Sequence, residues 1–77
     1  MNDDGRITVD PALMGGRPCI RGMRITVSNV LEMLAAGESA EEILRAFPWL
    51  EPEDIPACLA YAAWRMQEQE LLLPTSA

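Results

Sequence analysis

The chain has 77 residues, a net charge of −6 at pH 7, no lysine and no histidine. A chain of this length forms one small domain whose core leaves little surplus stability. The acidic balance disfavours binding to a phosphate backbone, and the lack of histidine removes the usual general base, so we do not expect an enzyme. No apolar run is long enough to cross a membrane.

Two cysteines, Cys19 and Cys58, lie far apart in the sequence, and the first residues contain no apolar signal segment. We therefore expect a cytoplasmic protein with reduced thiols. Two isolated cysteines do not make a zinc site, so we expect no metal and no cofactor. With neither a disulfide nor a metal, so small a domain is expected to bind another protein or a second copy of itself.

Charge is distributed unevenly along the chain. Residues 1–27 carry four arginines against three aspartates, whereas residues 28–77 carry two arginines against nine acidic residues. Only the N-terminal third is therefore suited to face a phosphate backbone. The acidic remainder matches a basic protein partner better, although an ordinary solvated surface explains the same charges.

A strand followed by a hairpin is predicted in residues 6–27. Residues 6–10 alternate in polarity and are rich in β-branched side chains, which predicts a short strand. Short apolar runs at 18–20 and 24–26 flank a tight connection in which Gly22 tolerates a positive φ. The two runs are predicted to pair across this turn.

Three of the six basic residues, Arg17, Arg21 and Arg24, lie in this hairpin. One interpretation is a purely structural hairpin that holds the helices together. The other is a β-ribbon whose arginines contact a partner. If the chain binds DNA, these arginines are the residues expected to touch it.

Two short helices are predicted after the hairpin. Residues 27–36 place apolar side chains three and four positions apart, and Gly37 ends this helix. The second helix covers residues 40–47, where Ser39 and Glu42 form a capping box.

The third predicted helix, residues 52–69, is apolar on two sides. We assign one stripe to the core: Ile55, Leu59, Ala62 and Met66. The other side carries Ala57, Ala60, Trp64 and Leu71, with Tyr61 beside them. A small chain cannot cover both sides, so the second side predicts an interface, although a single exposed tryptophan is a simpler explanation.

Two residues near the start of this helix are expected to affect the structure in different ways. Pro56 is expected to distort the first turn or to delay the regular helix, because its ring presses on the carbonyl four residues earlier. Trp49, in the link before the helix, is expected to close the end of the core.

Residues 1–70 form the predicted domain, and residues 71–77 form a tail that opens with Leu71, Leu72 and Leu73. A leucine run in water is unfavourable, so it folds back or meets a partner. We place the partner interface on this run together with Tyr61 and Trp64.

The sequence resembles the domain-of-unknown-function 433 family over about residues 7–63, and it departs from the usual pattern at Met23 and Pro56. The matched positions are Ile7, Asp10-Pro11, Gly15-Gly16-Arg17-Pro18, Ile20, Gly22, Arg24-Ile25, Val27, Leu34-Ala35-Ala36-Gly37, Ser39, Glu41-Glu42-Ile43-Leu44, Pro48, Leu50, Glu53-Asp54-Ile55, Ala57, Leu59 and Tyr61-Ala62. The resemblance implies a mainly α, three-helix, homeodomain-like or helix-turn-helix domain with a small N-terminal β-sheet. It also implies a VapB-like antitoxin that blocks a PIN-like ribonuclease toxin, with no catalytic residues to carry over.

Our leading hypothesis is therefore an antitoxin of a toxin–antitoxin system that also regulates its own operon. The alternatives are a helix-turn-helix DNA-binding transcriptional regulator and a small homodimeric interaction domain. A DNA-reading role for the third helix is disfavoured, because Glu53, Asp54 and Pro56 near its start are poor at contacting base edges. We predict a homodimer that binds DNA weakly when isolated.

Overall fold

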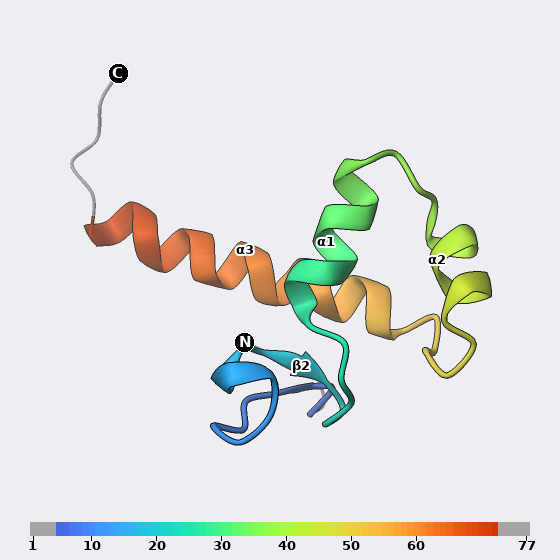
Figure 1. The fold of residues 1–77 in the computed structure, drawn as a ribbon. Helices are drawn as coiled ribbons and strands as arrows, with labels where there is room; N and C mark the ends of the chain where they lie inside the picture. Colours follow the sequence, from blue (N-terminus) through green and yellow to red (C-terminus); the bar gives the residue numbers. More distant parts are fainter. Residues whose placement is uncertain (1–4, 73–77) are drawn as a thin grey trace.

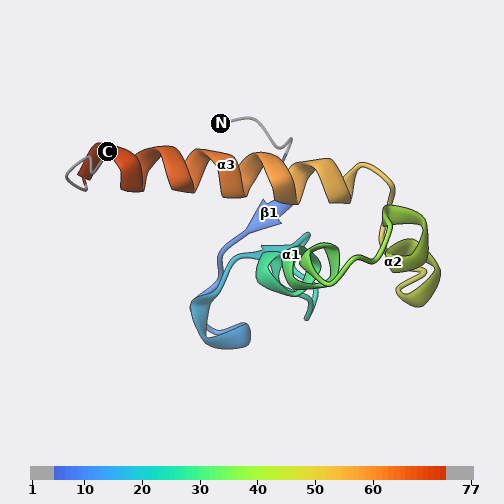
Figure 2. The same cartoon turned by 90° about the horizontal axis from the view of Figure 1, so that it is seen from above.

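The computed structural model describes residues 5–72, and it describes side-chain exposure as far as residue 68. This part of the chain is mainly helical, with a small antiparallel sheet at its N-terminal end (Figure 1). The elements in order are β1 (Ile7–Thr8), the 3-10 helix η1 (Met14–Gly16), β2 (Cys19–Ile20), α1 (Val27–Ala35), α2 (Ala40–Ala46) and α3 (Asp54–Leu72). The long helix α3 lies along one side of the molecule, and β1, α1 and α2 lie together on the other side of it (Figure 2).

Local capping signals define the ends of α1 and α2. Thr26 begins α1 with a reciprocal capping box, in which its hydroxyl accepts a hydrogen bond from the backbone amide of Asn29 at 3.0 Å. Gly37 ends α1 with a φ of 97°, a conformation that glycine adopts without steric cost. Ser39 and Glu42 form the predicted capping box at the start of α2. These boundaries lie within one residue of those predicted.

The predicted hairpin is present, but β2 pairs on both of its sides. Against β1, Ile7 lies opposite Ile20 in an antiparallel register. On the other side, the Ile20 amide donates to the carbonyl of Ile25 at 3.1 Å. The connecting turn has positive φ at both central residues, Arg21 and Gly22, as type I′ hairpin turns require. The strand predicted at residues 6–10 is thus two residues long and forms one edge of the sheet.

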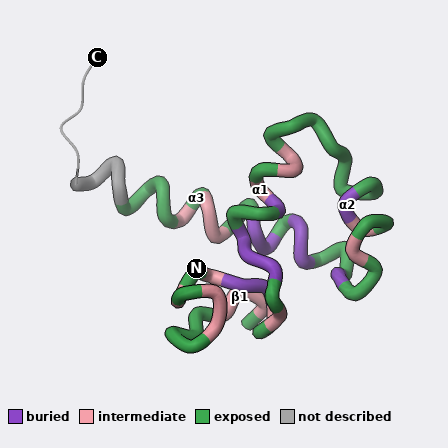
Figure 3. The backbone as a smooth tube through the Cα atoms, in the orientation of Figure 1, coloured by how far each residue is buried: buried purple, intermediate pink, exposed green. Residues whose placement is uncertain are grey.

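The hydrophobic core lies where β2, α1, α2 and the first half of α3 meet. Figure 3 shows this buried region next to a second half of α3 that is mostly exposed as far as exposure is described. The buried cluster consists of Ile20, Ile25, Val27, Val30, Ile43, Leu50, Ile55 and Cys58.

The core stripe predicted for α3 is partly wrong. Ile55 is buried, but Leu59 and Met66 are 49% and 56% exposed. The helix instead turns Asp54, Cys58 and Tyr61 toward the domain, a stripe at i, i+4 and i+7 that begins with a charged residue. Hydrophobic periodicity cannot select such a stripe, because it counts an aspartate as a surface residue.

The prediction that Trp49 closes the end of the core is also wrong, because Trp49 is 54% exposed. Its neighbour Leu50 is buried and fills that position. Of the two effects expected of Pro56, the structure shows the later start: the regular helix begins at Asp54, after the predicted start at residue 52, and places Pro56 in its first turn. The missing amide of a proline removes no intrahelical hydrogen bond there.

Both thiols are buried: Cys19 is 2% exposed and Cys58 is 0% exposed. Burial, with a smaller contribution from the nearby Asp54, raises the pKa of the Cys58 thiol to about 12. We therefore expect neither thiol to react with Ellman's reagent in native buffer, and both to react on unfolding in urea. Rapid stoichiometric labelling of the folded protein would contradict this expectation.

Candidate interaction surface along the third helix

An ion cluster around the buried Asp54 holds the start of α3 against the sheet. The Asp54 carboxylate, 0% exposed, accepts from Arg6 Nη1 at 2.9 Å and from Arg21 Nη2 at 2.9 Å. It also accepts from the backbone amide of Glu51 at 2.8 Å. These donors come from the residue before β1, the hairpin turn and the α2–α3 link, so one carboxylate joins three segments. We call Arg6, Arg21, Glu51 and Asp54 the clamp.

The clamp sets the charge state of its members. Burial opposes ionisation of Asp54, but hydrogen bonds from Arg21, the Glu51 amide and Arg6 outweigh it and lower its pKa below the ordinary 3.8. The same contacts raise the pKa of Arg6, first through Glu51 at 2.7 Å, and raise that of Arg21 through Asp54. The carboxylate therefore stays ionised although it is buried.

The lowered pKa of Asp54 predicts a loss of stability in acid. Its stabilising contribution is complete above the unfolded-state pKa and disappears as the pH falls through the folded-state pKa. We expect the free energy of unfolding in urea to fall from about pH 5 downward, and to fall less in Asp54→Asn. Parallel pH profiles for the two proteins would contradict the assignment.

An apolar groove opens where α3 leaves the domain. Figures 1 and 2 show the later half of α3 extending past the other elements. It has a volume of about 500 Å³ and lies between the start of α1 and the middle of α3. Its lining residues are Arg17, Pro18, Thr26, Val27, Ser28, Leu31, Tyr61, Ala62, Arg65 and Met66. A hollow of about 310 Å³ adjoins it and shares Pro18, Tyr61 and Arg65. We refer to the larger space as the α3 groove.

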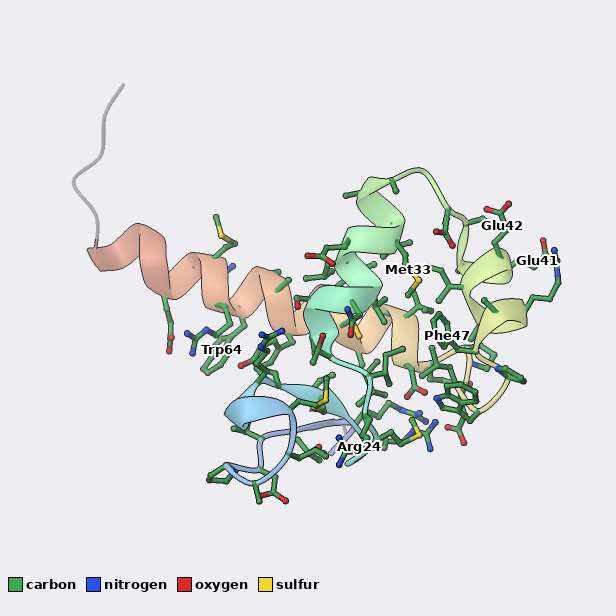
Figure 4. The ribbon with its side chains drawn as sticks, in the orientation of Figure 1. Arg24, Met33, Glu41, Glu42, Phe47 and Trp64 are labelled. Atoms are coloured by element: carbon green, nitrogen blue, oxygen red, sulfur yellow. The ribbon has the colours of Figure 1, made fainter. Side chains whose placement is uncertain are left out.

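Two of the residues predicted as the partner interface lie together on α3. Tyr61 is half-buried against the core and lines the α3 groove, and its ring centroid is 5.9 Å from that of Trp64. Figure 4 shows Trp64 projecting from α3 on the side of the N-terminal loop. Leu71 and Leu72 belong to α3, but their side chains, and all of Leu73, lie outside the described part of the chain.

The three arginines predicted as DNA contacts occupy three different environments. Arg21 belongs to the clamp, and its Nη2 also donates to the Trp49 carbonyl at 2.9 Å. Arg17 is exposed beside the α3 groove. Arg24 is exposed at the tip of the hairpin (Figure 4). Neither Arg17 nor Arg24 forms an ion pair with any residue between 5 and 68.

A second groove, of about 410 Å³, was not anticipated because Trp49 was expected to be buried. The rings of Phe47 and Trp49 meet edge to face at 5.5 Å on its wall. Figure 4 shows Met33 of α1 and Phe47 directed into the space between α1 and α2. The lining residues are Arg24, Ile25, Asn29, Glu32, Met33, Ala36, Glu38, Phe47 and Trp49.

Among the residues that the structure describes, no three acidic or cysteine side chains come close enough to hold a metal ion. Within the same residues, no helix combines the length and the apolar character that spanning a membrane requires.

The model of a family described as "Protein of unknown function (DUF433)" matches residues 7–62, most of this chain. The chain belongs to the DUF433 family. This DUF433 chain is 41% identical over 56 residues to "Uncharacterized protein y4eO" of Sinorhizobium fredii (strain NBRC 101917 / NGR234). That match covers 73% of the chain but spans only 25% of the relative.

A solved structure supports the DUF433 fold. The crystal structure of a DUF433 member from Anabaena variabilis ATCC 29413 matches with a TM-score of 0.78 and 26% sequence identity. The match covers 91% of this chain and 71% of that one. The family model ends at residue 62, so it includes Arg21, Glu51 and Asp54 but not the projecting half of α3.

Proposed function

We propose that this DUF433 chain is an antitoxin-type binding protein that neutralises a PIN-like ribonuclease in the cytoplasm, and that it acts as a homodimer. The observation that carries the ribonuclease part of the proposal is the half of α3 that projects from the domain with Trp64 only half-buried, and the α3 groove at its base carries the homodimer part. Met66, which lines this groove, is 56% exposed. A projecting helix with an apolar groove at its base suits helix-in-groove recognition of another protein.

Charge supports a ribonuclease as the partner. Residues 28–77 carry nine acidic residues and two arginines. A ribonuclease must attract phosphate and therefore presents basic groups along its RNA-binding channel. Acidic helices are complementary to such a surface and compete with RNA for it.

The order of the three helices fits the homeodomain-like, helix-turn-helix arrangement that the proposal includes. In such a unit the start of the last helix enters the major groove. Here the clamp occupies that position: Arg6 and Arg21 balance the charges of Glu51 and the buried Asp54, and the exposed Glu53 between them repels phosphate. This electrostatic surface favours a protein partner over DNA.

The proposal is tested by co-expressing the chain with the protein encoded by the neighbouring gene. We expect the two proteins to co-purify and the complex to lose the RNA-cleaving activity of the isolated partner. An unrelated ribonuclease serves as the control and should stay active and unbound. Undiminished cleavage at a molar excess of this chain would contradict the proposal.

A DNA-binding regulator is the second candidate, and one observation favours it: Arg17 and Arg24 are exposed without ion pairs among the described side chains. If they contact phosphates, Arg17→Ala/Arg24→Ala should reduce the salt dependence of duplex binding by about two counterions. Fluorescence anisotropy over a salt series measures this, with Arg45→Ala as the matched control. An unchanged slope would exclude these arginines as the contacts.

A further inference from the structure

The α3 groove combines an apolar floor with two cations that have no counter-ion. Tyr61, Ala62 and Met66 form the α3 side of the floor, and Arg17 and Arg65 lie beside them. Neither arginine forms an ion pair with any described residue. The groove therefore suits an occupant that is both apolar and acidic.

The projecting half of α3 has this character. Glu68 lies three residues after Arg65, is exposed, and forms no ion pair with any side chain that the structure describes. Positions three apart lie on the same face of a helix. Because one wall of the groove is α3 itself, a second α3 laid antiparallel along it brings each Glu68 toward the other chain's Arg65. Such a contact is self-complementary and closes at two copies.

We propose that the α3 groove is occupied by the projecting α3 of a second copy of this chain, with Arg17 and Arg65 of each copy facing Glu68 of the other. This inference rests on the homodimer in the proposed function and assigns it a surface. Docking buries Met66 and completes the burial of Tyr61, two apolar side chains of the groove that the single chain covers only in part.

The arrangement also separates two surfaces of α3. Successive helical residues turn by about 100°, so Trp64 and Met66 point to nearly opposite sides. A second copy in the groove covers Met66 and leaves the Trp64 side accessible. The dimer thus takes Tyr61 out of the surface proposed for the ribonuclease and leaves Trp64 to that surface.

Other occupants fit less well. A nucleic acid would satisfy the two arginines but would place phosphates over an apolar floor, on a chain whose net charge is −6. A basic segment of a partner would meet Arg17 and Arg65 directly, which is repulsive. A helix with exposed apolar and acidic side chains satisfies both features, and the projecting part of α3 carries Met66 and Glu68.

The test is a charge reversal read by sedimentation equilibrium of the full chain. We expect the parent to be a dimer, and Arg17→Glu and Glu68→Arg each to weaken dimerisation at least about tenfold, since each places like charges together. The double variant Arg17→Glu/Glu68→Arg should recover part of the dimerisation that Glu68→Arg loses, because the cation at position 68 then faces one acid and Arg65 instead of two arginines. Arg45→Glu, an exposed arginine on α2, is the matched control and should remain dimeric.

Far-UV circular dichroism of each variant checks that the fold is retained. A monomeric parent, or single variants that dimerise like the parent, would overturn the inference, and so would a double variant that dimerises no better than Glu68→Arg. If the charge variants lose ribonuclease binding while their oligomeric state is unchanged, the groove belongs to the ribonuclease. A dimer with the expected charge response that binds no ribonuclease would leave this inference standing and overturn the antitoxin proposal.

Discussion

Asp54→Ala is expected to lower the free energy of unfolding by about 3 kcal/mol, the typical effect of removing one partner of a buried ion pair. The substitution leaves Arg6 and Arg21 without their shared carboxylate and the Glu51 amide without its acceptor. A domain of 77 residues is stable by only about 5 kcal/mol, so this loss is a large fraction of the total. Urea unfolding monitored by circular dichroism measures it.

Two further variants separate the effect of losing the carboxylate charge from the effect of losing the side-chain volume. Asp54→Asn keeps the side-chain volume and an acceptor for the Glu51 amide, so we expect a smaller loss than for alanine. Glu53→Ala removes the exposed acid next to it and should change stability by about 0.5 kcal/mol or less. If Asp54→Ala is as mild as Glu53→Ala, the clamp does not hold the sheet to α3.

The burial of Asp54 in the clamp could not be predicted from the sequence. Glu53 and Asp54 are adjacent acids at the start of α3, and nothing in the neighbouring sequence distinguishes them. Asp54 is buried only because Arg6 and Arg21, 48 and 33 residues earlier in the chain, meet it in the folded structure. A charge whose partners are so distant cannot be recognised from its neighbours.

Features set by local chemistry were predictable. The start of α2 depends on Ser39 and Glu42, and the end of α1 depends on Gly37, so short segments suffice to place them. The orientation of α3 depends on the rest of the fold. Between Trp49 and Leu50, the larger side chain was expected in the core, but the path of the link buries the smaller one.

Only the α3 side of the candidate site could be predicted from the sequence. Tyr61 and Trp64 were identified because a helix that is apolar all round needs a second cover. The opposite wall of the α3 groove comes from Val27 and Leu31, with Arg17 at the rim. These residues lie 30 or more positions before Tyr61, and no periodicity within one helix brings them to it.

Trp64→Ala is expected to weaken the complex with the ribonuclease by at least about 2 kcal/mol, or roughly thirtyfold in Kd, if this tryptophan anchors the interface. Its indole is only half-buried within the chain, beside Tyr61, so it has surface left for a partner. Truncation after Gln69 should have a similar effect, because it removes the leucine run that the interface prediction includes. Isothermal titration calorimetry measures both changes.

The matched control is Leu59→Ala. Leu59 is an apolar residue of α3 that is 49% exposed, and it lies on a different side of the helix from Trp64. The Leu59→Ala variant should bind the ribonuclease as tightly as the parent does. Trp64→Phe retains an aromatic ring and should recover part of the affinity lost in Trp64→Ala, which a general loss of stability would not produce.

An alternative mode of inhibition inserts an arginine into the carboxylate cluster of the ribonuclease, where a guanidinium takes over the charge role of the catalytic metal. Of the two arginines that flank Cys19, Arg21 already donates to Asp54 and to the Trp49 carbonyl, which leaves Arg17 as the available one. Arg17→Ala should then preserve assembly of the complex while restoring cleavage of RNA. If Trp64→Ala and the truncation instead bind like the parent, the ribonuclease docks away from this side of α3. The groove beside Trp49, with its exposed ring and two glutamates, is then the next surface to test.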